Sequence, residues 1–203
     1  MHHAVIVAHP RRESLTCAIA GAYAQAVRGL GHTVVERDLY RMGFDPCLKA
    51  DEIPGPTGVS FAPQVLRERD LLKSADVFAF VYPLWFNAPP AMLKGYVDRV
   101  FSLFFGYEPA LGETNPLLDG KKLISFTTSG APESWVRDTG AMTALMTLFD
   151  AHLAGVTGLT VLDHVHNGGI VPGITEDAVA DILEGVRAAA RRAFAVDGAL
   201  SAV

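Results

Sequence analysis

The chain has 203 residues, of which half are hydrophobic and 19% are charged, and this ordinary globular composition argues against disorder over most of its length. A net charge of -5 without a run of lysine or arginine gives no electrostatic footprint for nucleic acid or for an anionic membrane. We therefore expect neither as a partner.

The first apolar stretch, Ala4 to Ala8, is too short for the core of a signal peptide or for a membrane span. We expect a cytoplasmic protein. Cys17 and Cys47 have no C-x-x-C spacing, and a chain of this size needs no disulfide framework. Both cysteines are expected to be reduced and mainly structural.

Short strands and helices alternate along the whole sequence. Apolar runs predict strands at Ala4 to Ala8, Thr33 to Val35, Val77 to Val81, Leu123 to Thr127 and Gly158 to Leu162. Helices are predicted at Ser14 to Leu30, Ala62 to Ala75, Pro90 to Phe105, about Gly140 to Ala154, and Thr175 to Phe194. Repeated βαβ units require parallel strands with right-handed crossovers. The sequence thus predicts one α/β domain over residues 1–203, a three-layer α/β/α sandwich around a five-stranded parallel sheet.

Between the second strand and the second helix lies the Pro- and Gly-rich segment Gly43 to Pro63. Predicted strands of one sheet flank it on both sides, so we interpret it as a long surface excursion and not as a linker between domains.

The loop after the first strand is a candidate phosphate site. It contains His9 and the turn Ser14-Leu15-Thr16, without the G-x-G-x-x-G of the ordinary dinucleotide fold. His9, Ser14, Thr16 and the free amides at the start of the next helix are suited to hold a phosphate. The alternative, which this segment leaves equally open, is a solvated His9 and a Ser14 that only caps the helix.

Two more loops follow buried strands. The third strand ends in Pro83-Leu84-Trp85-Phe86-Asn87, where prolines stop the ladder and flat apolar side chains project beyond it. The fourth ends in Thr127-Thr128-Ser129-Gly130, whose small residues allow a ligand edge to approach the backbone. In a sheet of order 2-1-3-4-5, the loops after strands one, three and four meet at a single switch point, where such sheets bind ligands. We interpret their convergence as a flavin site.

These loops give the chain a clear resemblance to the flavodoxin-like NAD(P)H:quinone oxidoreductase family. The strongest match is Pro83-Leu84-Trp85-Phe86 with the Pro-Ala-x-Leu-Lys-Gly core at Pro90 to Gly95, and the resemblance extends from Val5 to about Arg192. It implies a flavodoxin-like fold and a flavin held at its phosphate by His9 and Ser14 to Thr16. The flavin ring would lie along Pro83 to Asn87 and Thr127 to Gly130. The implied reaction passes two electrons from NAD(P)H through the flavin to quinones or similar planar acceptors.

The resemblance also implies a homodimer in which residues after the Pro90 helix reach the partner's flavin. Phe105 and Tyr107 match those positions, although a core role for Phe105 is equally open.

The chain departs from the family in two respects. Members carry a Tyr and a His near the reduced ring, and Trp135 and Thr139 approximately replace them as the catalytic candidates. An indole N–H cannot shuttle a proton and a threonine cannot become cationic, so the proton must come from water or another group. The position near Val179 lacks the Arg that reaches the adenine half of FAD in other members. We expect FAD, favoured by family habit and by an excursion that could cover an adenosine, with FMN as the alternative.

His152, His164 and His166 raise the question of a metal site. No cysteine or carboxylate falls at ligand spacing with them, so we expect no functional metal. Two alternatives to the enzyme are a regulatory flavoprotein subunit of a membrane transporter, such as a potassium-efflux system, and a flavodoxin-type electron carrier. The modest charge argues against the carrier.

Overall fold

The computed structural model describes residues 1–56, 58–110 and 113–195. Its centre is a parallel sheet of order β2-β1-β3-β6-β7. The strands are β1 (His2–Val7), β2 (Thr33–Asp38), β3 (Val77–Pro83), β6 (Lys122–Thr128) and β7 (Thr160–Asn167). With the strands of this sheet numbered along the chain, the order is the predicted 2-1-3-4-5.

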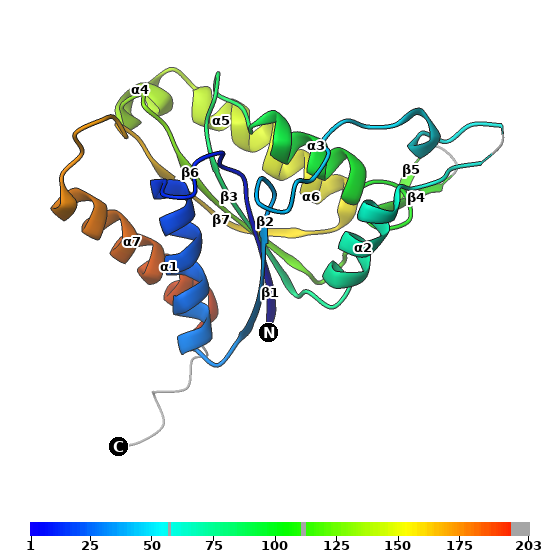
Figure 1. Ribbon diagram of the computed structural model, residues 1–203, viewed down its shortest axis with the longest axis horizontal. Helices are drawn as coiled ribbons and strands as arrows, with labels where there is room; N and C mark the ends of the chain where they lie inside the picture. The colour runs from blue at the N-terminus through cyan, green and yellow to red at the C-terminus, as the bar shows by residue number, and fades with distance from the viewer. Residues whose placement is uncertain (57, 111–112, 196–203) are drawn as a thin grey trace.

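Helices cover both faces of the sheet (Figure 1). One core cluster joins the sheet to α1 (Leu15–Gly29) and α7 (Glu176–Phe194), centred on Tyr23 and Phe126. The other joins it to helices on the opposite face, namely α2 (Pro63–Leu72), α3 (Ala91–Val100), α5 (Ala141–Leu145), η2 (Met146–Ala151) and α6 (His152–Thr157). The predicted three-layer α/β/α sandwich is confirmed.

Four local features differ from the sequence expectations. The strand predicted at 158–162 runs instead from Thr160 to Asn167, because an edge strand with polar, half-exposed side chains has no continuous apolar run. The helix predicted near 140–154 is three successive segments, and the middle one, η2, is a π-helix. The structure adds a hairpin of β4 (Tyr107–Ala110) and β5 (Glu113–Pro116), and the short helix α4 (Glu133–Asp138).

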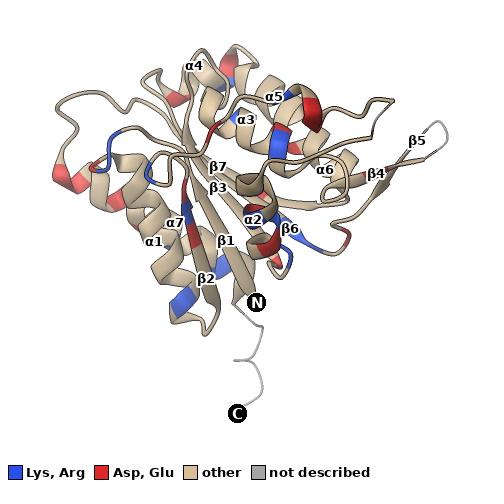
Figure 2. Ribbon diagram, turned by 45° about the vertical axis from the view of Figure 1, so that its right-hand side comes forward, with Lys and Arg blue, Asp and Glu red and all other residues tan. Residues whose placement is uncertain are grey.

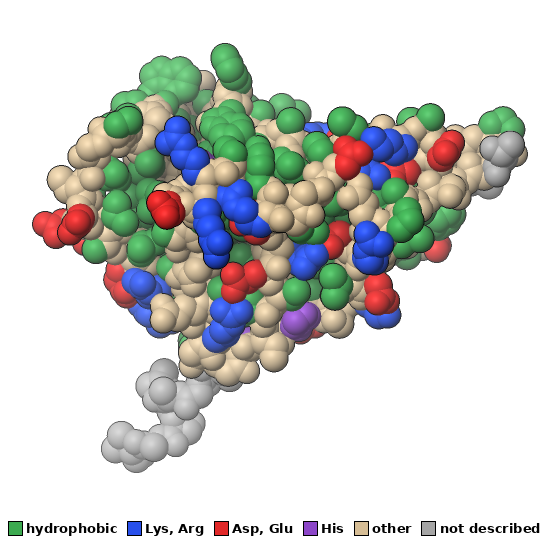
Figure 3. Space-filling view, viewed as in Figure 1, with side chains coloured by type: hydrophobic (Ala, Val, Ile, Leu, Met, Phe, Trp, Pro, Cys, Tyr) green, Lys and Arg blue, Asp and Glu red, His purple; other side chains and the backbone are tan. Residues whose placement is uncertain are grey.

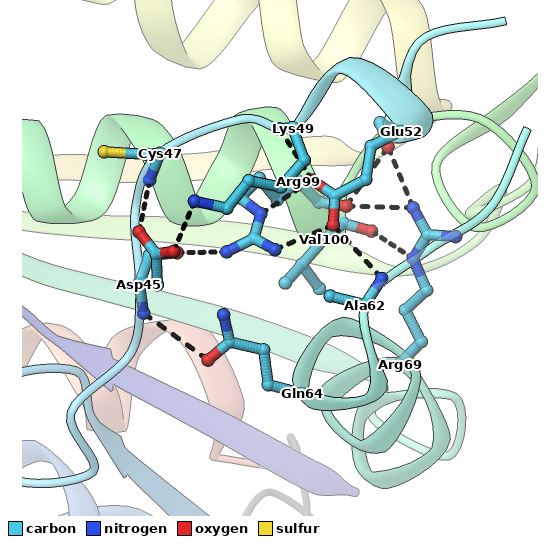
Figure 4. A network of polar contacts seen from close by, with 10 residues as sticks. Asp45, Cys47, Lys49, Glu52, Ala62, Gln64, Arg69, Arg99 and Val100 are labelled. Atoms are coloured by element: carbon cyan, nitrogen blue, oxygen red, sulfur yellow. Dashed lines mark hydrogen bonds and ion pairs between the residues drawn. The ribbon is translucent and has the colours of Figure 1, made fainter.

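The Gly43 to Pro63 excursion, which contains the 3₁₀ turn η1 (Ala50–Glu52), is fastened to α3 by a buried ion pair. Arg99 is fully buried, and its Nε and Nη2 each donate to a Glu52 oxygen at 2.7 Å (Figure 4). The third guanidinium nitrogen, Nη1, donates to the Asp45 carbonyl oxygen. Glu52 also accepts from the backbone amides of Lys49 and Ala62, at 3.3 and 3.2 Å. The ion pair thus provides hydrogen-bond partners for three backbone groups of the excursion.

Close packing of α3 against the excursion explains why the Pro-Ala-x-Leu-Lys-Gly core ends in a glycine, Gly95. A Cβ at this position would lie 2.1 Å from the Pro46 carbonyl oxygen and 2.5 Å from the Pro46 Cβ. Only glycine lets the excursion lie this close to the helix.

We expect Gly95→Ala to destabilise the fold by about 1–3 kcal/mol or more, because a backbone atom blocks the added methyl. Gly21→Ala in α1 is the matched control, since a Cβ there meets nothing within 4 Å. The control should be neutral or slightly stabilising. Urea unfolding of the two variants measures the difference, and equal stabilities would contradict the explanation.

The surface carries both signs of charge. Figure 2 shows the positions of Lys and Arg interspersed with those of Asp and Glu along the ribbon. Cys17 and Cys47 are free thiols, as expected. Within the described ranges, no helix combines the length and apolar character needed to cross a membrane.

Candidate active site at the carboxyl ends of the strands

Two adjoining cavities lie at the carboxyl ends of β1, β3 and β6. We call the first the polar cavity. Its volume is about 210 Å³, and it is lined by His9, Ser14, Leu15, Thr16, Pro83, Leu84, Trp85, Thr128, Ser129, Gly130 and Ile170. The second, the apolar cavity, has about 420 Å³ and is lined by Leu84, Phe86, Asn87, Ser129, Gly130, Ala131, Trp135 and Val136. Leu84, Ser129 and Gly130 belong to both, so the cavities form one continuous trough.

The start of α1 forms the floor of the polar cavity. Ser14 caps the helix by accepting from the Cys17 amide at 3.2 Å. The first amides of a helix have no intrahelical acceptor, and together with the helix dipole they favour an anion. Thr16 Oγ1 lies 3.4 Å from Thr128 Oγ1, so hydroxyls from two elements meet at this end. The Ser14 cap is confirmed, and the phosphate site at the same helix start stays a prediction.

His9 stands at the rim of the polar cavity. Its Nδ1 lies 3.0 Å from the Arg11 amide nitrogen and 3.1 Å from the Arg11 carbonyl oxygen. Burial, the largest cause, lowers the pKa of His9 below its ordinary value. The ring is therefore neutral near pH 7, and a bound phosphate would favour its cationic form.

The loop after β3 is a tight turn that exposes aromatic rings. Phe86 and Asn87 both have left-handed backbone angles, φ 50° and 54°, and two hydrogen bonds between Trp85 and Ala88 close the turn at 3.1 and 3.2 Å. Asn87 Nδ2 fastens the turn by donating to the Ala141 carbonyl oxygen at 2.9 Å. Such angles are costly for residues other than glycine and concentrate at functional sites.

The aromatic rings beside the trough are unusually exposed for a monomer surface. Phe86 has a relative exposure of 106%, Trp135 of 53% and Trp85 of 43%. Figure 3 shows apolar side chains gathered along the upper edge, where the loop after β3 and helix α4 lie in Figure 1. Exposed apolar patches of this kind mark ligand or partner sites.

Every residue predicted to bind the flavin or to act in catalysis lines one of the two cavities, except Thr127 and Thr139. Thr127 is fully buried and points beneath the trough, where it contacts two histidines. Thr139 lines neither cavity, and its Oγ1 donates to the Trp135 carbonyl oxygen at 2.7 Å. Phe105 belongs to the hydrophobic core, with its ring centroid 5.7 Å from that of Phe101. Tyr107 lines a separate cavity of about 380 Å³ against α3 and α6.

The excursion lies away from both cavities. None of its described residues, 43–56 and 58–63, lines either cavity, because the Arg99 pair holds it against α3. Sequence reasoning missed Ala131, Val136 and Ile170 as lining residues. Their positions depend on α4 and on the path after β7, neither of which leaves a motif. Among the described residues, no three His, Cys, Asp or Glu side chains gather closely enough to hold a metal ion.

Comparison with known proteins identifies the family. The model of the flavodoxin-like fold family Flavodoxin_2 matches residues 1–192. The chain is 30% identical to NAD(P)H dehydrogenase (quinone) 1 of Rattus norvegicus, over 89% of this chain and 73% of the rat protein. The chain belongs to the flavodoxin-like NAD(P)H:quinone oxidoreductase family.

Other relatives agree with this membership. An uncharacterized NAD(P)H oxidoreductase of Haemophilus influenzae is 39% identical over 64% of this chain, and the match spans 65% of that protein, just under two thirds. Among solved structures, an NAD(P)H:quinone oxidoreductase from Methanothermobacter marburgensis superposes with a TM-score of 0.83 at 29% identity. That superposition covers 95% of this chain and 96% of the other.

Proposed function

We propose that this protein is a flavin-dependent NAD(P)H:quinone oxidoreductase. The observation that carries the proposal is the continuous trough, polar at the start of α1 and apolar beside Phe86 and Trp135. A flavin mononucleotide unit has the same polarity, with a phosphate at one end and a flat ring system at the other. Membership of the family supports the same assignment.

The residues present fit such a group. Ser14, Thr16 and the first amides of α1 would hold the phosphate, and His9 would add a donor. Leu84, Ser129 and Gly130, which both cavities share, would flank the ring. When bound, a flavin supplies the redox chemistry, accepting an electron pair from NAD(P)H and passing it to a quinone.

The protein's own contribution is orientation and exclusion of water. The Leu84 amide donates to the Thr128 carbonyl oxygen at 2.7 Å, which holds the loops after β3 and β6 at a fixed separation. Trp135 and Phe86 give the apolar cavity flat walls, against which a planar donor or acceptor can stack. Neither Trp135 nor Thr139 can serve as the proton donor, for the chemical reasons given above.

For the flavin itself we propose FAD, with FMN as the alternative. Because the excursion lines neither cavity, the proposal of FAD depends on the flavin that members of the family usually bind. We also propose a homodimer, since Phe86 and Leu148, with relative exposures of 106% and 77%, are large apolar side chains without cover in a single chain. The mass of the purified protein by analytical ultracentrifugation tests this.

The visible spectrum of the purified protein tests the function. We expect a flavin spectrum that bleaches with NAD(P)H under anaerobic conditions and returns when a quinone is added. Chromatography of the released flavin distinguishes FAD from FMN. A protein that stays colourless after incubation with both flavins would refute the proposal. The relatives named above are oxidoreductases, and none of the described features favours a transporter subunit.

A further inference from the structure

A chain of polar side chains runs beneath the trough from η2 to Ser129. The Asp150 carboxylate pairs with His164 Nδ1, and His164 Nε2 lies 2.9 Å from Thr127 Oγ1. Thr127 Oγ1 lies 2.9 Å from His166 Nδ1, and His166 Nε2 lies 3.1 Å from Ser129 Oγ. We call these five side chains, Asp150, His164, Thr127, His166 and Ser129, the relay chain.

The fold explains why the five groups meet. Strands β6 and β7 lie side by side (Figure 1), and Thr127 pairs with His166 in their register. Because alternate residues of a strand share a face, Thr127 and Ser129 point to the same side as His164 and His166. That side is covered by η2, whose Asp150 is buried and also accepts from Ser125 Oγ at 2.8 Å.

The relay chain connects two cavities. At one end, Ser129 lines both the polar and the apolar cavity. At the other, Asp150 lines a separate cavity of about 450 Å³, together with Thr147 and Val161. The middle of the chain is sealed, since the His164 side chain has no exposed area and Thr127 is fully buried.

One arrangement of hydrogens satisfies all of these contacts together with the bond from Ser129 to Ala131, and it carries one proton more than two neutral imidazoles beside an ionised Asp150. Ser129 Oγ donates to the Ala131 carbonyl oxygen at 2.9 Å, which uses its only hydrogen. His166 must then donate from Nε2 to Ser129, and accept at Nδ1 from Thr127. Thr127 must in turn accept from His164 Nε2. Since His164 Nδ1 also faces the Asp150 carboxylate, both nitrogens of His164 carry hydrogens in this loaded arrangement.

A second arrangement of hydrogens fits the same heavy atoms with one proton fewer. Ser129 Oγ donates to His166 Nε2, His166 Nδ1 donates to Thr127, and Thr127 donates to His164 Nε2. His164 Nδ1 still donates to Asp150. Passing from the loaded to the unloaded arrangement moves three hydrogens, those of His164 Nε2, Thr127 and His166, by one bond toward Ser129. Ser129 gives up its bond to the Ala131 carbonyl oxygen and releases that proton.

We propose that the relay chain delivers one proton to the substrate being reduced in the trough, with Ser129 as the terminal donor. This rests on the proposed function, whose balance is NAD(P)H + quinone + H⁺ → NAD(P)⁺ + hydroquinone. NAD(P)H supplies the electron pair and one hydrogen, and the relay chain supplies the other as a proton. The proton leaves Ser129 Oγ, three hydrogens shift toward Ser129, and His164 becomes neutral. Solvent then reprotonates the His164–Asp150 pair through the cavity at Asp150.

The surroundings keep the middle of the chain neutral. Burial, and then the neighbouring His164, lowers the pKa of His166, so this ring carries no charge near pH 7. A neutral imidazole passes a proton by exchanging its tautomer, which the loaded and unloaded arrangements require. The other titratable groups that act on the chain are Glu133 of α4, which raises the pKa of His166, and Tyr82 of β3, a buried phenol without a hydrogen-bond partner.

Breaking the chain at Thr127 tests the proposal. We expect Thr127→Val to slow reoxidation of the reduced holoenzyme by a quinone at least about tenfold, within the range typical of general acid catalysis. Reduction of the holoenzyme by NAD(P)H is a hydride transfer that draws no proton from the relay chain in this proposal, so its rate should stay the same. Thr127→Ser, which retains the hydroxyl, should restore reoxidation. Thr33→Val is the matched control, since this strand threonine is also bonded to a histidine, His2, at the far end of the sheet.

Stopped-flow spectroscopy in H₂O and D₂O measures these rates. Wild-type reoxidation should show a solvent isotope effect that the Thr33→Val variant keeps. Wild-type speed in Thr127→Val would overturn the proposal. Equal impairment of Thr127→Val and Thr127→Ser would also overturn it, because the chain would then only support the structure.

Imidazole ¹⁵N spectra of the apoprotein test the relay chain without any turnover. Adding acid should move the hydrogen of His166 from Nδ1 to Nε2, as the change from the unloaded to the loaded arrangement requires. In Thr127→Val this move should be lost, because His166 is then cut off from the rest of the chain. A His166 that keeps one tautomer throughout the wild-type titration would overturn the proposal. A preparation that neither binds flavin nor oxidises NAD(P)H would refute the proposed function instead, and these spectra would still decide whether the hydrogens are coupled.

Discussion

Replacing Gly130 by leucine is expected to weaken flavin binding roughly ten- to hundredfold while the protein stays folded. Gly130 borders both cavities, so a branched side chain there would occupy the junction of the trough. To bind, the flavin would have to push this side chain or the cavity walls aside, which reduces the binding free energy by about 1–3 kcal/mol, the usual range for overpacking. Fluorescence titration of the apoprotein with FAD and with FMN measures the loss.

Gly130→Ala is the matched control for this prediction. An added Cβ would have only the Ile170 carbonyl oxygen near it, at 3.7 Å, which is an ordinary contact. The alanine variant should therefore bind flavin nearly as well as the wild type. If the leucine variant also binds normally with an unchanged unfolding midpoint, the trough is not the flavin site.

Replacing Arg99 by methionine is expected to destabilise the protein by about 3–5 kcal/mol, because Glu52 would remain buried without its partner. For a chain of this length each kcal/mol lowers Tm by about 2–4 °C. Thermal unfolding followed by circular dichroism measures the shift. Lys94→Met in the same helix removes only an exposed pair with Asp98, and should cost less than about 1 kcal/mol.

The effect should also depend on pH. The hydrogen bonds from Arg99 lower the pKa of Glu52 below its ordinary value. A carboxyl with a lowered pKa in the folded state stabilises the protein above its unfolded pKa, and this stabilisation is lost as the pH falls through the folded value. The difference in the free energy of unfolding between wild type and Arg99→Met should therefore be largest near neutral pH and smaller in acid. A difference that grows in acid would contradict the ion-pair explanation.

Much of the fold could be predicted because buried strands and crossovers leave local signals. The run Val77 to Val81 has no polar residue, and its position between helical segments fixes a parallel neighbour. The edge strand β7 was harder, because Asp163, His164 and His166 interrupt any apolar run. The sequence thus located the strand but placed its end five residues too early.

The candidate site could be predicted where a loop directly follows a strand. His9, Leu84 and Ser129 all follow strands that neighbour one another in the sheet, so topology alone brings them together. Thr127 lies only one residue before Thr128, yet the alternation of strand faces sends its side chain below the trough. Sequence inspection cannot assign that face until the length of the strand is known.

The relay chain could not be predicted, because none of its contacts is local in sequence. Asp150 lies in the π-helix η2, and its carboxylate pairs with His164 of β7. The register of β6 against β7 then places His166 beside Thr127. The histidines were noticed as metal candidates, whereas the carboxylate that pairs with one of them lies fourteen residues away.

The fastened excursion should also protect the native protein against proteases. Leu48 and Ile53 are exposed apolar residues in a long connection, the kind of site at which nicking usually occurs. Their neighbours Lys49 and Glu52, however, are bonded to each other or to Arg99, so the backbone can enter a protease cleft only if that network opens. Cleavage between residues 48 and 53 therefore reports an opening event that exposes α3 as well.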